Sequence, residues 1–165
     1  MWEIVAATAA AEFRDVADVR QVTQLVIRTL LAALLGGLIG LEREMHGKPA
    51  GIRTHMLIAL GSALFVLVPQ QGGMDMESLS RVIQGLLAGV GLLCAGSILK
   101  SNSDDEQVTG LTSAAGLWMT SAIGVAIGLG RESTAIIATL LVLGILMLER
   151  PLRRLKQRSG DGPTG

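Results

Sequence analysis

Apolar residues dominate five stretches of the chain, and short polar segments separate these stretches from one another. The stretches are residues 22–41, 54–69, 82–99, 108–130 and 133–148. Each approaches the roughly 20 residues that a helix needs to cross a hydrocarbon core of about 30 Å. The stretches do not alternate as barrel strands must, and helices satisfy their own backbone groups in lipid. We therefore predict an all-α membrane protein with five transmembrane helices packed through small residues.

The segment before the first stretch has a different character. Residues 1–20 lack a basic region and a continuous apolar run, so they do not resemble a secretory signal. Apolar residues recur there at helical spacing, at Trp2, Val5, Ala9, Phe13 and Val16. We expect residues 1–21 to be an amphipathic helix on the membrane surface or a flexible tail. Residues 22–149 then form the transmembrane domain, and residues 150–165 form a basic tail.

The distribution of lysine and arginine predicts the orientation in the membrane. If the C-terminus is cytoplasmic, nine of these residues lie on that side and four lie on the other. The positive-inside rule therefore places the N-terminus outside and the C-terminus in the cytoplasm. Five of the nine follow the last stretch, where they suit a contact with anionic lipid or a partner. The simpler alternative is that these five basic residues only fix the orientation of the chain in the membrane.

Composition excludes several functions. Half of the 165 residues are apolar, 17% are charged and the net charge is zero, which argues against a nucleic-acid partner. A single cysteine, Cys94, allows neither an internal disulfide nor a multi-thiol metal site. The last three stretches contain no histidine that could activate a serine. We expect no catalytic residues and no cofactor.

Small residues repeat at every fourth position in three of the predicted spans. The positions are Gly36 and Gly40, then Gly85 and Gly89, and then Gly116, Thr120, Gly124 and Gly128. Lipid tails give helices no hydrophobic reason to associate, so small faces of this kind permit close backbone contact instead. They predict either packing within the chain or a seam between copies. We favour packing for the four-residue face.

Arg28 is a charged residue inside the first predicted span. A charge at membrane depth costs several kcal/mol unless it is paired or reaches the interface. Because Arg28 lies near the external end, its side chain can extend to the interface. It can also pair with Asp75 or Glu77 in the next external loop.

The connection between the first two spans is the most polar part of the chain. Residues 42–55 hold two carboxylates, three cations and two histidines, and one proline and two glycines define the backbone path. With the hydroxyls that open the fourth span, the candidate functional residues are Arg28, Glu42, Arg43, Glu44, Lys48, Arg53, Thr54, Thr112 and Ser113. They would bind a partner, an anion or a cation, or would form only a solvated loop.

Metal binding has little support in the sequence. His46 and His55 lack the further soft ligands that a zinc site needs. The acidic residues Asp104, Asp105 and Glu106 have the hard oxygen ligands that Mg²⁺ prefers. Three adjacent acids are more often a solvated loop, so the metal ligands are left unassigned.

Four segments, taken in order, resemble the MgtC/SapB family of bacterial inner-membrane proteins. They read LLGGLIGLERE at 34–44, AGIRTHML at 50–57, GVG with AG within 89–96, and GLTSAAGLW at 110–118. The resemblance covers roughly residues 22–148. Larger members carry a soluble C-terminal domain, and about sixteen residues follow the last span here. We therefore expect a short form that lacks this domain.

The resemblance implies a role in magnesium limitation, acid stress or virulence, exerted by binding other membrane proteins such as ATP synthase. We expect a non-enzymatic regulator of the inner membrane that forms a homo-oligomer, with a dimer favoured. The alternative is a transporter or channel for Mg²⁺ or another small solute. A cation path should place acidic residues within the spans, and none lies at mid-depth. Because five spans give no internal inverted repeat, a two-fold pore would need at least a dimer.

Overall fold

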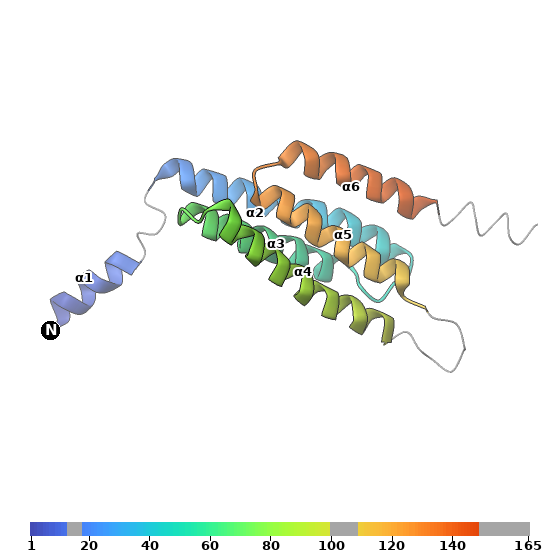
Figure 1. The fold of residues 1–165 in the computed structure, drawn as a ribbon, viewed down its shortest axis with the longest axis horizontal. Coiled ribbons are helices and arrows are strands. Elements are labelled where there is room, and N and C mark those ends of the chain that lie inside the picture. Colours follow the sequence, from blue (N-terminus) through green and yellow to red (C-terminus); the bar gives the residue numbers. More distant parts are fainter. Residues whose placement is uncertain (13–17, 100–108, 149–165) are drawn as a thin grey trace, which may run out of the picture.

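The computed structural model describes residues 1–12, 18–99 and 109–148, and the regular elements in this part are all helices (Figure 1). The helices are α1 (Trp2–Glu12), α2 (Val19–Met45), α3 (Ile52–Gln71), α4 (Met76–Leu99), α5 (Leu111–Gly128) and α6 (Glu132–Met147). The acidic residues 104–106 and the basic tail lie outside the described residues.

Four helices of the described part, α2 to α5, are long and apolar enough to cross a membrane. The fifth predicted span corresponds to α6, which is apolar but has 16 residues. At 1.5 Å per residue, this helix is about 24 Å long, which is less than the hydrocarbon core. The architecture of the described residues is therefore all-helical, with four full-length candidate spans and two shorter apolar helices, α1 and α6.

Helices α2, α3 and α5 pack against one another and form the core of the bundle (Figure 1). Helix α4 lies against α3 and α5, and α6 lies against α2 and α5. The apolar core joins residues of four helices: Ala32, Leu35, Ile39, Ala59, Ala63, Ile123, Ile127, Ala135, Val142 and Leu146. Helix α1 lies apart from this bundle, and the side chains of residues 1–11 are exposed (Figure 1).

Two connections are shorter than the hydropathy pattern predicts. Helix α2 continues to Met45 and α3 begins at Ile52, so the first connection contains only residues 46–51. Helix α4 begins at Met76, and its first turn is polar. Asp75 caps this turn, because its carboxylate accepts a hydrogen bond of 2.8 Å from the Ser78 N–H. This hydrogen bond holds the pKa of the Asp75 carboxyl below its ordinary value.

Glycines bring α2 into backbone contact with α3. A Cβ atom added to Gly36 would lie 2.6 Å from the carbonyl oxygen of His55, and one added to Gly40 would lie 2.6 Å from the Ile52 Cα. Neither distance leaves room for a methyl group unless the helices separate. The two glycines therefore set the spacing between α2 and α3.

Glycines of α5 bring this helix into backbone contact with the other side of α3. A Cβ atom on Gly124 would overlap the Ala59 carbonyl oxygen and lie 2.8 Å from the Ser62 Cβ. One on Gly128 would lie 2.7 Å from the Ala63 carbonyl oxygen. Helix α3 is therefore held between α2 and α5 at the shortest spacing that backbones allow.

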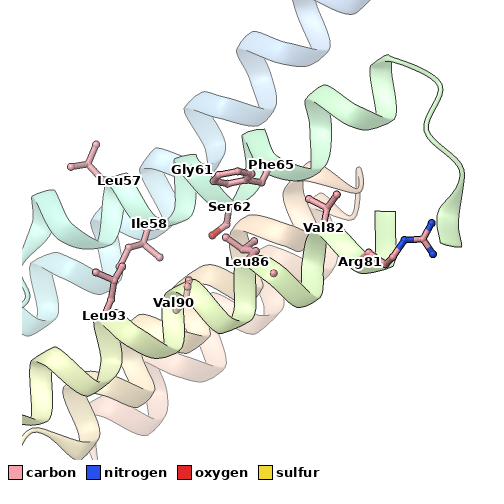
Figure 2. Close-up of a pocket in the computed structure, with 12 residues that line it drawn as sticks. Leu57, Ile58, Gly61, Ser62, Phe65, Arg81, Val82, Leu86, Val90 and Leu93 are labelled. Carbon is pink, nitrogen blue, oxygen red and sulfur yellow. The ribbon is translucent and has the colours of Figure 1, made fainter. Parts of the chain in front are cut away.

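The other predicted packing glycines are less confined. A Cβ atom on Gly116 would lie 3.6 Å from His55 Cε1, which is an ordinary contact. Added Cβ atoms on Gly85 and Gly89 of α4 meet nothing within 4 Å. These two glycines face a groove of about 570 Å³ between α3 and α4, with mainly apolar walls and Arg81 at one end (Figure 2).

Candidate functional site

A cluster of buried polar side chains lies where the C-terminal end of α2 meets the first turn of α3 and the middle of α5. Arg43, His55 and Thr120 are fully buried, and Glu42 retains 7% exposure. On α2, Glu42 and Arg43 continue the buried face that also carries Ile39. The helix face that forms the apolar core therefore ends in a pair of opposite charges.

Glu42 is the central acceptor of this cluster. Its Oε2 accepts a hydrogen bond from Arg43 Nε. The Nδ1 of His46 lies 2.6 Å from the carbonyl oxygen of Glu42 and 3.0 Å from its Oε1. Because a buried ion pair is costly to break, removing either partner would cost about 3–5 kcal/mol. Glu42, Arg43 and His46 therefore form one connected polar group at this end of α2.

His55 connects α3 to α5 inside the bundle. Its Nδ1 lies 2.7 Å from Thr120 Oγ1, and the same hydroxyl lies 2.9 Å from the Gly116 carbonyl oxygen. The Thr120 hydroxyl donates to this carbonyl, so His55 Nδ1 must carry the hydrogen that the hydroxyl accepts. Thr120 is thus held as a structural link and is not activated as a nucleophile.

Glu44 ties the first connection together. Its Oε2 accepts a hydrogen bond of 2.9 Å from the backbone N–H of Ile52, the first residue of α3. A negative charge at a helix N-terminus is favourable because the free N–H groups point toward it. A Cβ atom added to Gly51 would overlap the Glu44 carboxylate, so a larger residue there would displace this side chain from the connection. Glu44 therefore positions the connection.

The remaining predicted residues lie at the same end of the bundle. Arg53 and Thr54 are exposed in the first turn of α3, and Lys48 is half-buried in the connection. In the first turn of α5, Thr112 is exposed and Ser113 is buried. The structure therefore separates a buried group around Glu42 from an exposed surface that includes Arg53.

Sequence reasoning missed two members of the buried cluster. His55 was considered only as a zinc ligand, although it lies four and eight residues before the small buried residues Ala59 and Ala63. Thr120 was considered only as one step in the small-residue face of α5. The signal for both was a polar residue in register with a helix face that is otherwise made of small residues.

Arg28 lies at the opposite end of the bundle, and its predicted partners are wrong. Its Nε lies 3.2 Å from Glu132 Oε1, and its Nη1 donates to the Gly128 carbonyl oxygen at 3.1 Å. Asp75 caps α4, and Glu77 Oε1 lies 3.3 Å from Arg81 Nη1. The pairing with Glu132 became possible because α6 begins beside α2, which the local sequence does not reveal.

Between the two ends, the described polar side chains in the core are hydroxyls that bond to a hydroxyl of a neighbouring helix or to a carbonyl of their own helix. Ser62 Oγ lies 2.9 Å from Ser121 Oγ, and Thr139 Oγ1 donates to the Ala135 carbonyl oxygen at 2.8 Å. In the described part of the chain, no group of three or more His, Cys, Asp or Glu side chains is placed so that it could hold a metal ion.

Comparisons with known proteins identify relatives along most of the chain. It is 45% identical to SrpB of Synechococcus elongatus over 79% of this chain and 78% of SrpB. It is 43% identical to YhiD of Escherichia coli K12 over 74% of this chain, and 37% identical to MgtC of Salmonella typhimurium over 80%. These two matches span 59% of YhiD and 55% of MgtC. No solved structure matches.

The family comparison agrees with these relatives. The model of the MgtC family matches residues 29–155, which include the buried cluster and the helices that form it. This match covers more than half of the sequence, and the relatives named above are aligned over most of it. The chain therefore belongs to the MgtC family.

Proposed function

We propose that this chain is a non-enzymatic regulator of the bacterial inner membrane that acts by binding other membrane proteins. Magnesium limitation, stress adaptation and virulence are the settings that its family resemblance implies. The observation that carries the proposal is the close contact of α2 and α5 with α3. Backbone contact at Gly36, Gly40, Gly124 and Gly128 leaves no space for a solute between these helices.

A solute path also needs polar groups that replace water along its length. In the described bundle, the buried charges gather near Glu42 at one end, and Arg28 pairs with Glu132 at the other. The hydroxyls between these ends already bond to one another or to their own helix. A single copy of the bundle thus favours a scaffold over a channel.

Two surfaces of the bundle suit a protein partner. Arg53 and Thr112 are exposed beside the buried cluster, where they can contact a polar segment outside the lipid. The exposed Gly85 and Gly89 of α4 allow another membrane helix to approach closely. The same α4 face suits a second copy of this chain, so we also propose a homo-oligomer, with a dimer favoured.

The alternative is a transporter or channel for Mg²⁺ or another small solute. It is supported by the name of YhiD, which includes the words magnesium transporter. Because α3 is in backbone contact with both α2 and α5, we place the path of this alternative between copies. The exposed glycine face of α4 is the surface of the described bundle along which such a path would run.

We also propose that α6 is the fifth span and that the C-terminus is cytoplasmic. Helix α6 is apolar, and one of its faces packs on the bundle through Ala135, Thr139, Val142 and Leu146. The lysine and arginine count supports this orientation. A reporter fused after Leu148 should be active only in the cytoplasm. Activity only outside the cytoplasm would reject the orientation.

Affinity capture from native membranes tests the regulator proposal. The tagged wild-type chain should retain a membrane protein in stoichiometric amount. Arg53→Ala should lose this partner, since the residue is exposed and lies outside the packed core. Arg81→Ala, which removes an exposed cation at the opposite end, is the matched control and should retain the partner. Retention by both variants, or by neither, would contradict the proposed surface.

A further inference from the structure

A second, smaller pocket lies beside the buried cluster, between the ends of α2 and α6. Its volume is about 270 Å³. The walls are apolar and include Leu38, Met45, Leu143 and Met147, and its polar groups are Glu42 and His46. Neither the family comparison nor the proposed function assigns a role to this pocket.

One oxygen of Glu42 lacks a hydrogen-bond donor in the described structure. Glu42 is more than nine-tenths buried, and its Oε1 has no hydrogen-bond partner there, whereas Oε2 accepts from Arg43. His46 Nδ1 is 3.0 Å from Oε1, but the 2.6 Å contact with the Glu42 carbonyl oxygen requires the single Nδ1 hydrogen. A buried carboxylate oxygen without a donor is unfavourable. A ligand in the pocket whose N–H group reached Oε1 would complete the hydrogen bonding of this carboxylate.

The position and walls of the pocket define the ligand further. The pocket lies at the last turn of α2, beside the connection that begins at His46. Because this is the end of a candidate span, the pocket is near the membrane surface. Leu41, which also lines the pocket, is an exposed large apolar side chain that suits an acyl chain. A free polar solute would leave the apolar walls unused. A lipid whose headgroup carries N–H donors would match both parts.

We propose that this pocket binds the ammonium headgroup of phosphatidylethanolamine, with Glu42 Oε1 as acceptor and the acyl chains against α2 and α6. An ammonium group offers three N–H donors and a positive charge that complements the carboxylate. Phosphatidylcholine has no N–H group, and phosphatidylglycerol has no cation. The site is therefore selective for the headgroup and independent of whether the chain regulates a partner or carries a solute.

Native mass spectrometry of the full chain tests the proposal. The detergent-solubilised protein is incubated with equal amounts of phosphatidylethanolamine, phosphatidylcholine and phosphatidylglycerol, and the bound lipids are counted. The wild type should retain phosphatidylethanolamine about tenfold over the other two, as expected for one charge-assisted hydrogen bond. Glu42→Gln should reduce this preference by about tenfold for the same reason.

A second variant keeps the test independent of the Glu42–Arg43 pair. Leu143→Trp fills the pocket from α6 and should abolish the preference, although Glu42 is intact. Leu140→Trp adds the same group to an exposed α6 position that does not line the pocket, and it should bind as the wild type does.

Three outcomes would overturn the proposal. The first is an unchanged preference in Leu143→Trp, and the second is an equal loss in Leu140→Trp. The third is displacement of the lipid by an excess of free ethanolamine, which would show that the acyl chains contribute nothing. Because partner capture is measured separately, failure here would leave the regulator proposal standing, and the converse also holds.

Discussion

Gly124→Ala adds one methyl group at the point where α5 touches α3. The new Cβ atom would lie 2.8 Å from the Ser62 Cβ and would overlap the Ala59 carbonyl oxygen. Carbon atoms ordinarily pack about 3.5–4.0 Å apart, so the two helices must separate by about 1 Å. That shift would also stretch the bonds Ser62–Ser121 and His55–Thr120.

The size of the effect follows from these contacts. Overpacking a close-packed interior costs about 1–3 kcal/mol, and each strained hydrogen bond adds about 0.5–1.5 kcal/mol. Alanine recovers about 1 kcal/mol through its higher helix propensity than glycine. We expect Gly124→Ala to lower the free energy of unfolding by about 1–5 kcal/mol.

Gly85→Ala is the matched control for this substitution. Its added Cβ atom meets nothing within 4 Å, so only the gain in helix propensity remains. We expect stability to be unchanged or to rise by up to about 1 kcal/mol. Both variants are unfolded reversibly with dodecyl sulfate in mixed micelles, at protein concentrations where the chain is monomeric. Equal stability of Gly124→Ala and Gly85→Ala would refute the backbone contact between α3 and α5.

Three further predictions concern individual contacts. A double-mutant cycle of Arg28→Gln and Glu132→Gln should give a coupling of about 0.5 kcal/mol in the unfolding assay, because Glu132 is 37% exposed and solvent screens the pair. Thr120→Val should lower the free energy of unfolding by about 1–2 kcal/mol, since it leaves the buried histidine Nδ1–H without an acceptor. Asp75 should titrate below its ordinary pKa of 3.8 by ¹³C NMR, because the Ser78 N–H stabilises the carboxylate. Its contribution to stability is thus present above the ordinary pKa and is lost as the pH falls through the lowered one.

Each of these contacts has a control or a contrary result. Zero coupling would mean that Arg28 and Glu132 do not interact in solution. Thr120→Ser keeps the hydroxyl and should retain most of the stability that Thr120→Val loses. An Asp75 pKa at or above the ordinary value would contradict the cap at the start of α4.

Apolar length was sufficient to predict the helices of the bundle but not all of their ends. The runs that became α2, α3 and α5 were predicted because apolar residues occupy every face of these helices. The start of α4 was placed too late, since its first turn, from Met76, is polar and resembles a loop. Helix α2 continues past the predicted end at residue 41 to Met45, and this extension buries Glu42 and Arg43.

The buried cluster could be predicted only in part. The sequence drew attention to Glu42 and Arg43 as charges near the first connection, but their burial depends on contact with α3 and α5. The link between His55 and Thr120 joins residues 65 positions apart, and no local pattern predicts such a pair. For the same reason, Arg28 was assigned to acids in the nearest external loop, although its partner Glu132 is 104 positions away.

Magnesium flux into liposomes that contain only this chain tests the central claim most directly. The claim is that the chain acts as a regulator and carries no Mg²⁺, as the backbone contact of α3 with both α2 and α5 supports. The account predicts that Mg²⁺ enters these liposomes no faster than it enters protein-free liposomes, with or without a membrane potential. A saturable influx that increases with the amount of protein would contradict it.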